Sequence, residues 1–230
     1  MLWSRATVRT GIAGDASSSL PPGCGAGVMN AAPPGSPAER RELRRLLLRR
    51  RAGMSRTARA AAERRITVLI ARRSWLAPGA AVGLYVARGS EVGTQALRAL
   101  AARRGARVYL PRVVDYRAAR MEFLADRGVA LQRNRFHIGE PRFGARARAR
   151  ALSVVLLPLV GFDSRGHRLG SGAGYYDRLL AFRRHTRGSP LLVGIAFECQ
   201  RCPQIDPASH DVPLDAVVTE SGIQFFKRRP

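Results

Sequence analysis

The most apolar stretch of this 230-residue chain is "ALSVVLLPLVGFD", residues 151–163. No apolar run in the chain approaches the roughly 20 residues that a membrane-spanning helix needs. The stretch is rich in Val and Leu, and a glycine-rich turn follows it, which is typical of a buried strand. We therefore expect it to be the central strand of the fold.

Short apolar runs alternate with helical patterns on both sides of this strand. The other expected strands are "AAVGLYVA", "ARVYLPRV", "PLLVGIAFE" and "DAVVTE", and Pro111 is expected to stop the second of these. The helix "EVGTQALRALAARRG", which ends at Gly105, separates the first two, and another helix, to about Arg184, follows the glycine-rich turn after the central strand. The segments "MEFLAD" and "VALQRN" predict an antiparallel edge hairpin. This alternation predicts a Rossmann-like three-layer α/β fold, a single domain with a mostly parallel sheet flanked by helices.

The N-terminal segment has a different composition. Residues 1–37 are rich in Gly, Ala, Ser and Pro and show no periodicity. This composition predicts a disordered leader ahead of a domain that covers residues 38–230. Met29 stands near the end of the leader and is an alternative translation start.

Two helices are expected where the domain begins. Ser36 suits an N-cap, Pro37 the first helical position and Glu39 a capping box. This helix should run to about Arg51, and Ser55 should cap the next one. One face of the first helix carries leucines and the other faces carry arginines: Leu43, Leu46 and Leu47, and Arg40, Arg41, Arg44 and Arg45.

The formal net charge is +24, and Lys227 is the only lysine, so nearly all of the basic charge is arginine. Such a charge can bind nucleic acid, an anionic membrane or small polyanions. An arginine-favouring codon usage explains it equally well, because the arginines are scattered along the chain. Aromatic residues make up 7% of the chain and are not interleaved with the arginines, so we expect a local anion site and neither a nucleic-acid nor a membrane partner.

Cys24, Cys199 and Cys202 do not make a disulfide framework, and no secretory signal is recognisable. We therefore expect a cytoplasmic, reducing location. The C-x-x-C formed by Cys199 and Cys202 lacks the further ligands of a structural zinc site, so we interpret it as a chance occurrence.

The segment "RLGSGAGYYDRLL", residues 168–180, directly follows the central strand. Its three glycines are Gly170, Gly172 and Gly174. They permit positive φ angles and let a phosphate approach backbone N–H groups closely. A helix from Tyr175 onward would add an N-terminus that favours anions, and Arg168 adds a guanidinium that suits phosphate. The motif is neither a Walker A loop nor a dinucleotide fingerprint, so a plain tight turn is the alternative to a phosphate cradle.

Three carboxylates are candidates for the same edge of the sheet. Asp177 lies just inside the expected helix and Asp211 in the loop before the last strand, and two carboxylates together with nucleotide phosphates suit Mg²⁺. Glu91 follows the first strand, where ligands of open α/β sheets bind. Each has a structural alternative: Asp177 as a helix-dipole partner, Asp211 as a turn cap and Glu91 as a helix N-cap.

Seven segments in chain order carry a resemblance: "RRELRRLLLRRRAGMS", "LYVARGSEVGT", "LPRV", "FHIGEP", "LPLVGFDSRGHRLGSGAGYYDRLL", "IAFECQ" and "HDVPLDAVVTE". From about Arg40 to Ile223 the chain resembles the 5-formyltetrahydrofolate cyclo-ligase family, also called methenyltetrahydrofolate synthetases. The resemblance implies an α/β ligase that uses ATP and Mg²⁺ to convert 5-formyltetrahydrofolate to 5,10-methenyltetrahydrofolate, with release of ADP and phosphate.

The resemblance also assigns roles to residues. The family's ATP-binding positions match Arg40, Arg44, Arg168, Leu169, Gly170, Ser171, Gly172, Ala173, Gly174, Tyr175 and Tyr176. Its substrate-binding positions match Val86, Glu91, Gly172, Gly174 and Tyr175, its catalytic positions Arg168 and Tyr176, and its metal positions Asp177 and Asp211. Arg40 replaces the family's usual lysine, and Ser171 and Ala173 replace bulkier, basic or glycine residues, so side-chain contacts at these positions differ.

Two alternatives to the cyclo-ligase function stay open at this point. One is an ATP-binding paralogue without cyclo-ligase activity, and the other is an arginine-rich nucleic-acid-binding protein. For the enzyme itself we expect a monomer. We also hypothesise that arginines near the cleft attract the polyglutamate tail of a folate substrate.

Overall fold

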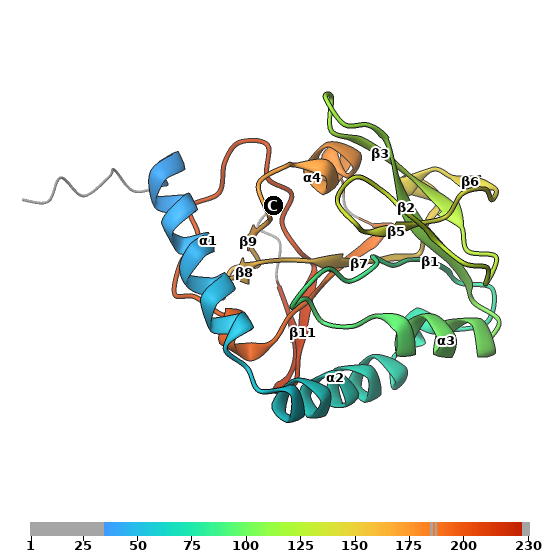
Figure 1. Ribbon diagram of the computed structural model, residues 1–230, viewed down its shortest axis with the longest axis horizontal. Helices are drawn as coiled ribbons and strands as arrows, with labels where there is room; N and C mark the ends of the chain where they lie inside the picture. The colour runs from blue at the N-terminus through green and yellow to red at the C-terminus, as the bar shows by residue number, and fades with distance from the viewer. Residues whose placement is uncertain (1–34, 185, 187, 227–230) are drawn as a thin grey trace, which may run out of the picture. The chain divides into compact units, whose positions relative to one another are not determined.

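The computed structural model describes residues 35–184, 186 and 188–226 (Figure 1). The leader predicted for residues 1–37 lies outside the described residues, apart from positions 35–37, and so does the alternative start at Met29. Within the described part, no helix has the length and apolar character needed to cross a membrane.

The main sheet has eight strands among the described residues, in the order β12-β11-β10-β7-β1-β2-β3-β6. These strands are β1 (Ala81–Gly83), β2 (Arg107–Asp115), β3 (Arg120–Ala125), β6 (Arg146–Ala147), β7 (Val154–Pro158), β10 (Leu191–Ile195), β11 (Ala216–Thr219) and β12 (Gly222–Phe225). The five strands from β11 to β2 are parallel. At the edges, β12 and β3 run antiparallel to them, and β6 pairs antiparallel with β3. The mostly parallel sheet with β7 near its middle confirms the predicted architecture.

Helices cover both faces of this sheet. The helices of the described residues are α1 (Pro37–Ala52), which lies apart from the two faces, α2 (Arg56–Ala71), α3 (Gln95–Arg103) and α4 (Tyr175–Leu179), with short 3-10 turns η1 (Ser74–Leu76), η2 (Ala149–Ala151), η3 (Ala181–Arg184) and η4 (Glu198–Gln200). Helices α2 and α3 lie together on one side of the sheet (Figure 1). One buried cluster joins them to the strands, through side chains such as Ile66 and Leu97. The cluster on the other face contains Leu180 with Phe182 of η3 packed against it. The sheet is therefore the middle of three layers.

The crossovers diverge between β1 and β7. From β1 the chain passes through α3 to β2, whereas from β7 it passes through α4 to β10, on the other side of the sheet order. Adjacent strands whose connections leave in opposite directions open a crevice at their carboxyl ends, which is where open α/β sheets bind ligands. The fold thus provides a ligand site beyond β1 and β7.

Helix α1 packs on a small hairpin that follows β7, formed by β8 (Gly161–Phe162) and β9 (Arg168–Leu169). Leu47 is fully buried with Val160 and Leu169 in a separate apolar cluster. A Cβ atom at Gly161 would overlap the Leu47 side chain, so glycine is required for this close approach. The helix begins as predicted, since the Ser36 hydroxyl accepts a hydrogen bond from the Glu39 N–H (3.2 Å).

The edges of the sheet differ from the prediction. Pro111 does not stop β2, which continues to Asp115, because Pro111 lies beyond the three residues that pair with β1 and has only β3 beside it. Proline is tolerated where a strand is an edge. The segment "VALQRN" does not pair with "MEFLAD". It forms its own hairpin of β4 (Gln132–Arg133) and β5 (Gly139–Glu140), closed by the Asn134 side chain, which accepts hydrogen bonds from the N–H groups of Phe136 and Ile138.

Two helices are shorter than predicted, and one strand was missed. α3 begins at Gln95, because the preceding Gly93 N–H donates to the Glu63 carboxylate of α2 (2.8 Å) and does not enter the helix. α4 ends at Leu179 and continues only as the η3 turn. The final edge strand β12 pairs antiparallel with β11 across a tight turn, which the sequence analysis had not identified.

Replacing Leu47 with alanine should loosen α1 from the β8–β9 hairpin. Truncating a fully buried leucine to alanine lowers the free energy of unfolding of a protein by roughly 2–5 kcal/mol. For a domain of this size that corresponds to a fall in Tm of about 4–20 °C. The control is Leu46→Ala, one position along, because Leu46 is 37% exposed. Thermal denaturation of both variants checks the packing, and equal Tm shifts would contradict it.

Candidate active site

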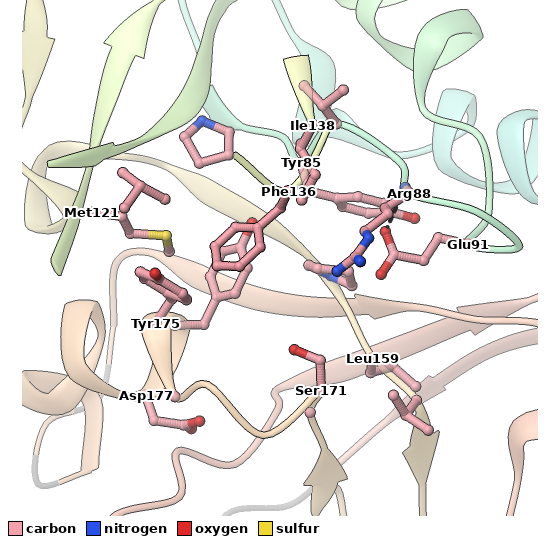
Figure 2. A pocket seen from close by; sticks show the side chains of 18 of the residues that line it. Tyr85, Arg88, Glu91, Met121, Phe136, Ile138, Leu159, Ser171, Tyr175 and Asp177 are labelled. Atoms are coloured by element: carbon pink, nitrogen blue, oxygen red, sulfur yellow. Dashed lines mark hydrogen bonds between the residues drawn. The ribbon is translucent and has the colours of Figure 1, made fainter. Parts of the chain in front are cut away.

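A pocket occupies the crevice beyond β1 and β7 (Figure 2). Its polar side combines the β1 loop, the end of β7 and the glycine loop, and its apolar side comes from β2, β3 and the β4–β5 hairpin. The polar side is lined by Tyr85, Val86, Arg88, Glu91, Pro158, Leu159, Val160, Arg168, Gly170, Ser171, Gly174, Tyr175, Tyr176 and Asp177. The apolar side is lined by Pro111, Val113, Met121, Asn134, Phe136, Ile138 and Glu140. No role is predicted from the sequence for the residues of this second set.

The apolar side forms an aromatic slot. Figure 2 shows Phe136, Met121 and Tyr175 gathered across the pocket from Arg88 and Glu91. Phe136 is held by an edge-to-face contact with Tyr116, with ring centroids 5.5 Å apart. Such a slot accepts a flat, partly apolar ring system by stacking and dispersion.

The opposite end of the pocket carries a carboxylate. Glu91 accepts a hydrogen bond from the Arg88 N–H (2.9 Å). Burial raises the pKa of the Glu91 carboxyl, while that N–H and the neighbouring Arg51 guanidinium oppose the rise. Tyr85 lies near Glu91 and donates its hydroxyl proton to the Val92 carbonyl oxygen (2.7 Å), and burial raises the pKa of this phenol as well. Glu91 therefore presents acceptor oxygens in a weakly hydrated place.

The glycine loop joins β9 to α4. Gly172 and Gly174 have φ angles of 106° and 71°, which side-chain-bearing residues rarely adopt. Gly170 has no positive φ, and its carbonyl oxygen accepts a hydrogen bond from Arg44 Nε of α1 (2.8 Å). Burial lowers the pKa of the Arg44 guanidinium, and the nearby Arg40 lowers it further, but an arginine stays protonated. The loop and α1 together thus place a cation beside a permissive backbone.

A buried ion pair closes this loop. Arg168 is 5% exposed and donates to the Asp177 carboxylate (2.5 Å) and to the Val212 carbonyl oxygen. The same Asp177 oxygen accepts from the Val212 N–H (3.2 Å). Since Val212 directly follows Asp211, the structure brings the segments of the two candidate metal ligands together.

Asp211 itself faces α1. Its carboxylate accepts from Arg40 (2.8 Å) and from the Ala208 N–H (2.9 Å), while Arg40 also donates to the Asp206 carbonyl oxygen (2.6 Å). Among the described residues, no group of three or more His, Cys, Asp or Glu side chains is arranged to hold a metal ion. A cation here would therefore need ligands from a bound molecule in addition to these carboxylates.

The remaining predicted site residues differ in burial and in whether they line the pocket. Val86 and Ser171 line the pocket, whereas Leu169 is fully buried under α1, so only its backbone belongs to the loop. Tyr176 packs against both large apolar clusters and lines the pocket, and burial raises the pKa of its phenol well above the ordinary range, so it stays a neutral hydroxyl. Ala173 is exposed, and its carbonyl oxygen accepts from Arg178 (2.8 Å).

The C-x-x-C pair shows no special chemistry. Both thiols are free, and Cys202 donates to the Phe162 carbonyl oxygen (3.3 Å). Burial raises the pKa of the Cys202 thiol to about 11, which disfavours the reactive thiolate. The two cysteines are part of the packing around η4.

These features define a Rossmann-like α/β protein with a ligand pocket at a topological switch point. The model of the 5-formyltetrahydrofolate cyclo-ligase family matches residues 36–220, and the chain belongs to this family, as its resemblance predicted.

Curated relatives and solved structures agree with this membership. The chain is 37% identical over 145 residues to the 5-formyltetrahydrofolate cyclo-ligase of Escherichia coli strain K12, which covers 62% of this chain and 79% of that enzyme. The Mycolicibacterium smegmatis cyclo-ligase is 31% identical over 159 residues, or 65% and 80% of the two chains. The NMR structure of Aquifex aeolicus 5,10-methenyltetrahydrofolate synthetase superposes with a TM-score of 0.67 at 28% identity, covering 83% of this chain and 94% of that one.

A second solved structure, the 5,10-methenyltetrahydrofolate synthetase of Mycoplasma pneumoniae, has a TM-score of 0.63 at 20% identity. It covers 79% of this chain and 99% of that one, and it supports the fold.

Asp177→Ala should destabilise the protein as well as alter the site, because it removes the partner of a buried guanidinium. Breaking a buried ion pair from one side costs roughly 3 kcal/mol, about 6–12 °C in Tm here. Asp177→Asn keeps an acceptor oxygen for Arg168 and should cost less than half of that.

The control for this measurement is Glu42→Ala, which removes the exposed partner of Arg45 (3.1 Å) and should change the stability by less than about 0.5 kcal/mol. Thermal denaturation of the three variants decides the matter. If Asp177→Ala has the same Tm as the wild type, the ion pair between Arg168 and Asp177 does not stabilise the fold.

Proposed function

We propose that this protein converts 5-formyltetrahydrofolate to 5,10-methenyltetrahydrofolate with conversion of ATP to ADP and phosphate. Membership of the cyclo-ligase family supports the reaction. The observation that carries the proposal is a single pocket with two unlike halves, an aromatic slot that ends near a carboxylate and a glycine loop backed by an arginine. A folate and a nucleotide are molecules of these two chemistries.

The folate fits the half of the pocket that faces the β4–β5 hairpin. The pyrimidine ring of its tetrahydropteridine is planar and suits the slot beside Phe136 and Tyr175, with Val86, in the loop after β1, as an apolar contact. Pterin rings carry N–H donors on the pyrimidine edge, and the carboxylate of Glu91 supplies acceptors for them. The formyl group on N5 would then face the glycine loop.

The ATP phosphates fit the glycine loop. Gly172 has a positive φ angle and nothing closer than the Arg44 guanidinium where a Cβ would stand, so the backbone there is open to close approach. A Cβ at Gly172 would lie 3.9 Å from the guanidinium carbon of Arg44, so a phosphate near this glycine is within reach of that cation. Arg40 adds a second positive charge on the same helix face.

Asp177 and Asp211 are the residues that would hold Mg²⁺ with the nucleotide. Carboxylate oxygens are the donors that Mg²⁺ prefers, and the ion usually takes one or two of them together with phosphates. Each of these carboxylates is now paired with an arginine, Arg168 or Arg40. Bound Mg²⁺ would neutralise charge on the phosphates during transfer.

The proposed reaction proceeds through a phosphorylated formyl group. The formyl oxygen attacks the γ-phosphorus, the bond to the β–γ bridging oxygen breaks, and ADP leaves. The N10 nitrogen then adds to the activated formyl carbon and loses its proton to solvent. The carbon–oxygen bond breaks, phosphate leaves with the electron pair, and an N5–C–N10 amidinium remains.

This chain's residues would act by positioning and by charge. Arg44 and the loop N–H groups would orient the γ-phosphoryl group toward the formyl oxygen, which is how phosphoryl transfer is mainly catalysed. Arg168 fixes the loop through Asp177, and the neutral, half-buried Tyr176 helps to exclude water from the reacting atoms. No protein nucleophile is required.

The reaction itself is tested by the absorbance of methenyltetrahydrofolate formed from 5-formyltetrahydrofolate, with ATP and Mg²⁺ present or withheld. Arg44→Met should raise the KM for ATP at least tenfold, because it removes the cation beside the glycine loop, and should leave the KM for the folate within about threefold.

Arg45→Met is the matched control, since Arg45 is exposed on the same helix and should leave both constants unchanged. Equal KM values for ATP in Arg44→Met and Arg45→Met would refute the placement of the nucleotide beside Arg44. No turnover by the wild type would leave an ATP-binding paralogue as the better description.

We also propose that the substrate includes polyglutamylated folate. A second, polar pocket adjoins the aromatic slot, since both share Asn134 and Glu140, and it is lined by Arg112, Arg133 and Arg142. A chain of γ-linked glutamates carries one carboxylate for each residue, so these arginines would bind it in a salt-dependent way.

Arg133→Gln should therefore raise the KM for a polyglutamate substrate about three- to tenfold at low salt and leave that for the monoglutamate unchanged. Arg65→Gln on the exposed side of α2 is the control. The measurement is the KM for the polyglutamate and for the monoglutamate substrate, at low and at high salt. A wild type with equal constants for the two substrates at low salt would refute the proposal.

We further propose that the enzyme works as a cytoplasmic monomer. The described residues of one chain supply both halves of the pocket, and the free thiols of Cys199 and Cys202 suit a reducing compartment. Light scattering on the purified protein tests the oligomeric state.

A further inference from the structure

Arg51 is an unusual member of the arginine-rich helix α1. It lies in the last turn, and only 5% of it is exposed, whereas its neighbours Arg49 and Arg50 are exposed. A buried arginine needs partners that satisfy its donors, because desolvating a charge is costly. Its partners therefore indicate what it is for.

The Arg51 guanidinium connects the two strand ends that form the switch point. Its Nε donates to the Ser90 hydroxyl (3.0 Å), in the loop after β1. Another of its nitrogens donates to the carbonyl oxygen of Leu159 (3.2 Å), immediately after β7. One rigid, planar group thus spans the crevice from behind, a geometry that lysine with its single ammonium cannot reproduce.

Both anchor points lie directly at the pocket. Leu159 lines it, and Ser90 precedes Glu91, whose side chain points into it (Figure 2). We propose that Arg51 is a positioning residue for substrate binding, which fixes the Ser90–Glu91 corner against the end of β7 and holds the Glu91 carboxylate in place for the folate. The inference rests on the proposed function.

The charges around Glu91 strengthen this assignment. The groups that act on it are the Arg51 guanidinium from α1 and Arg88 from its own loop, and the phenols of Tyr85 and Tyr176 lie near enough to interact with its charge. Glu63 of α2 lies close by, bonded to the Gly93 N–H. Burial raises the pKa of Glu91, and Arg51 counters that rise, so Arg51 favours the ionised carboxylate.

Folate affinity should depend on pH through the ionisation of Glu91. The ionised form of Glu91 accepts hydrogen bonds from the folate, so affinity falls as the pH drops through the pKa of this group. Removing the charge of Arg51 raises that pKa further. The acid limb of folate binding should therefore move to higher pH in an uncharged variant and stay in place when the charge is kept.

The experiment compares Arg51→Met and Arg51→Lys with the wild type, and uses Arg50→Met on the exposed side of the same turn as control. Equilibrium binding of 5-formyltetrahydrofolate is measured without ATP across the pH range, together with kcat, both KM values and Tm. We expect Arg51→Met to weaken folate binding at least tenfold at neutral pH and to shift the acid limb upward. Arg51→Lys should weaken binding a few-fold without moving the limb, and the KM for ATP should stay within about twofold in both.

A purely structural role would lower the Tm but leave the acid limb where it is, and that result would overturn the proposal. Folate affinity within twofold of wild type in Arg51→Met would do the same. If Arg51→Met fails to fold, the test uses Arg51→Lys and Ser90→Ala. Each of these removes a hydrogen bond of the Arg51 guanidinium, so the proposal requires each to weaken folate binding more than Arg50→Met does. If the wild type binds no 5-formyltetrahydrofolate, the proposed function fails; if it binds and the variants match it, only the role of Arg51 fails.

Discussion

The glycine loop depends on the buried ion pair between Arg168 and Asp177. These two residues stand at the two ends of the loop, so their contact closes it and limits the conformations that its glycines would otherwise allow. A guanidinium that is 5% exposed cannot be left without a carboxylate, which makes the closure obligatory. Val212 joins the pair through both its N–H and its carbonyl oxygen, so the loop that carries Asp211 is set by the same contact.

Helix α1 contacts four segments of the site and holds them together, because the four residues that make these contacts share one face of the helix. Arg40, Arg44, Leu47 and Arg51 are spaced three or four residues apart, so that each lies about one turn from the next on the same side of a helix. They reach, in order, the Asp211 loop, the glycine loop, the β8–β9 hairpin and the switch point. A large arginine surplus is therefore compatible with a packed fold, since a guanidinium can bridge several carbonyl and carboxylate oxygens at once.

The sequence predicts the centre of this molecule better than its edges. β7 and the glycine loop were found because a buried parallel strand is a continuous apolar run followed by turn residues. On α1, the pattern indicates a leucine face with arginines outside, yet Leu46 is partly exposed and Arg51 is buried. Two tertiary hydrogen bonds of the Arg51 guanidinium, to Ser90 and to the Leu159 carbonyl oxygen, offset the cost of burying it. The role of Phe136 was also missed: it stands in a short hairpin without periodicity, and only its place in "FHIGEP" marked it.

The two halves of the pocket have separate structural origins. β2 is much longer than β1, so its later residues and the antiparallel β3 stand beyond the carboxyl end of β1 as a wall, on which the β4–β5 hairpin lies. The polar half comes from parallel strand ends, which are fixed by the central layer. The halves meet at Tyr175, which faces the slot, and at Tyr176, which packs into the apolar clusters on both faces of the sheet. In the proposed reaction the formyl oxygen must meet the γ-phosphorus at this junction, so the alignment of the two substrates depends on both halves: Tyr176, which is anchored in the core, and Phe136, which the β4–β5 hairpin carries.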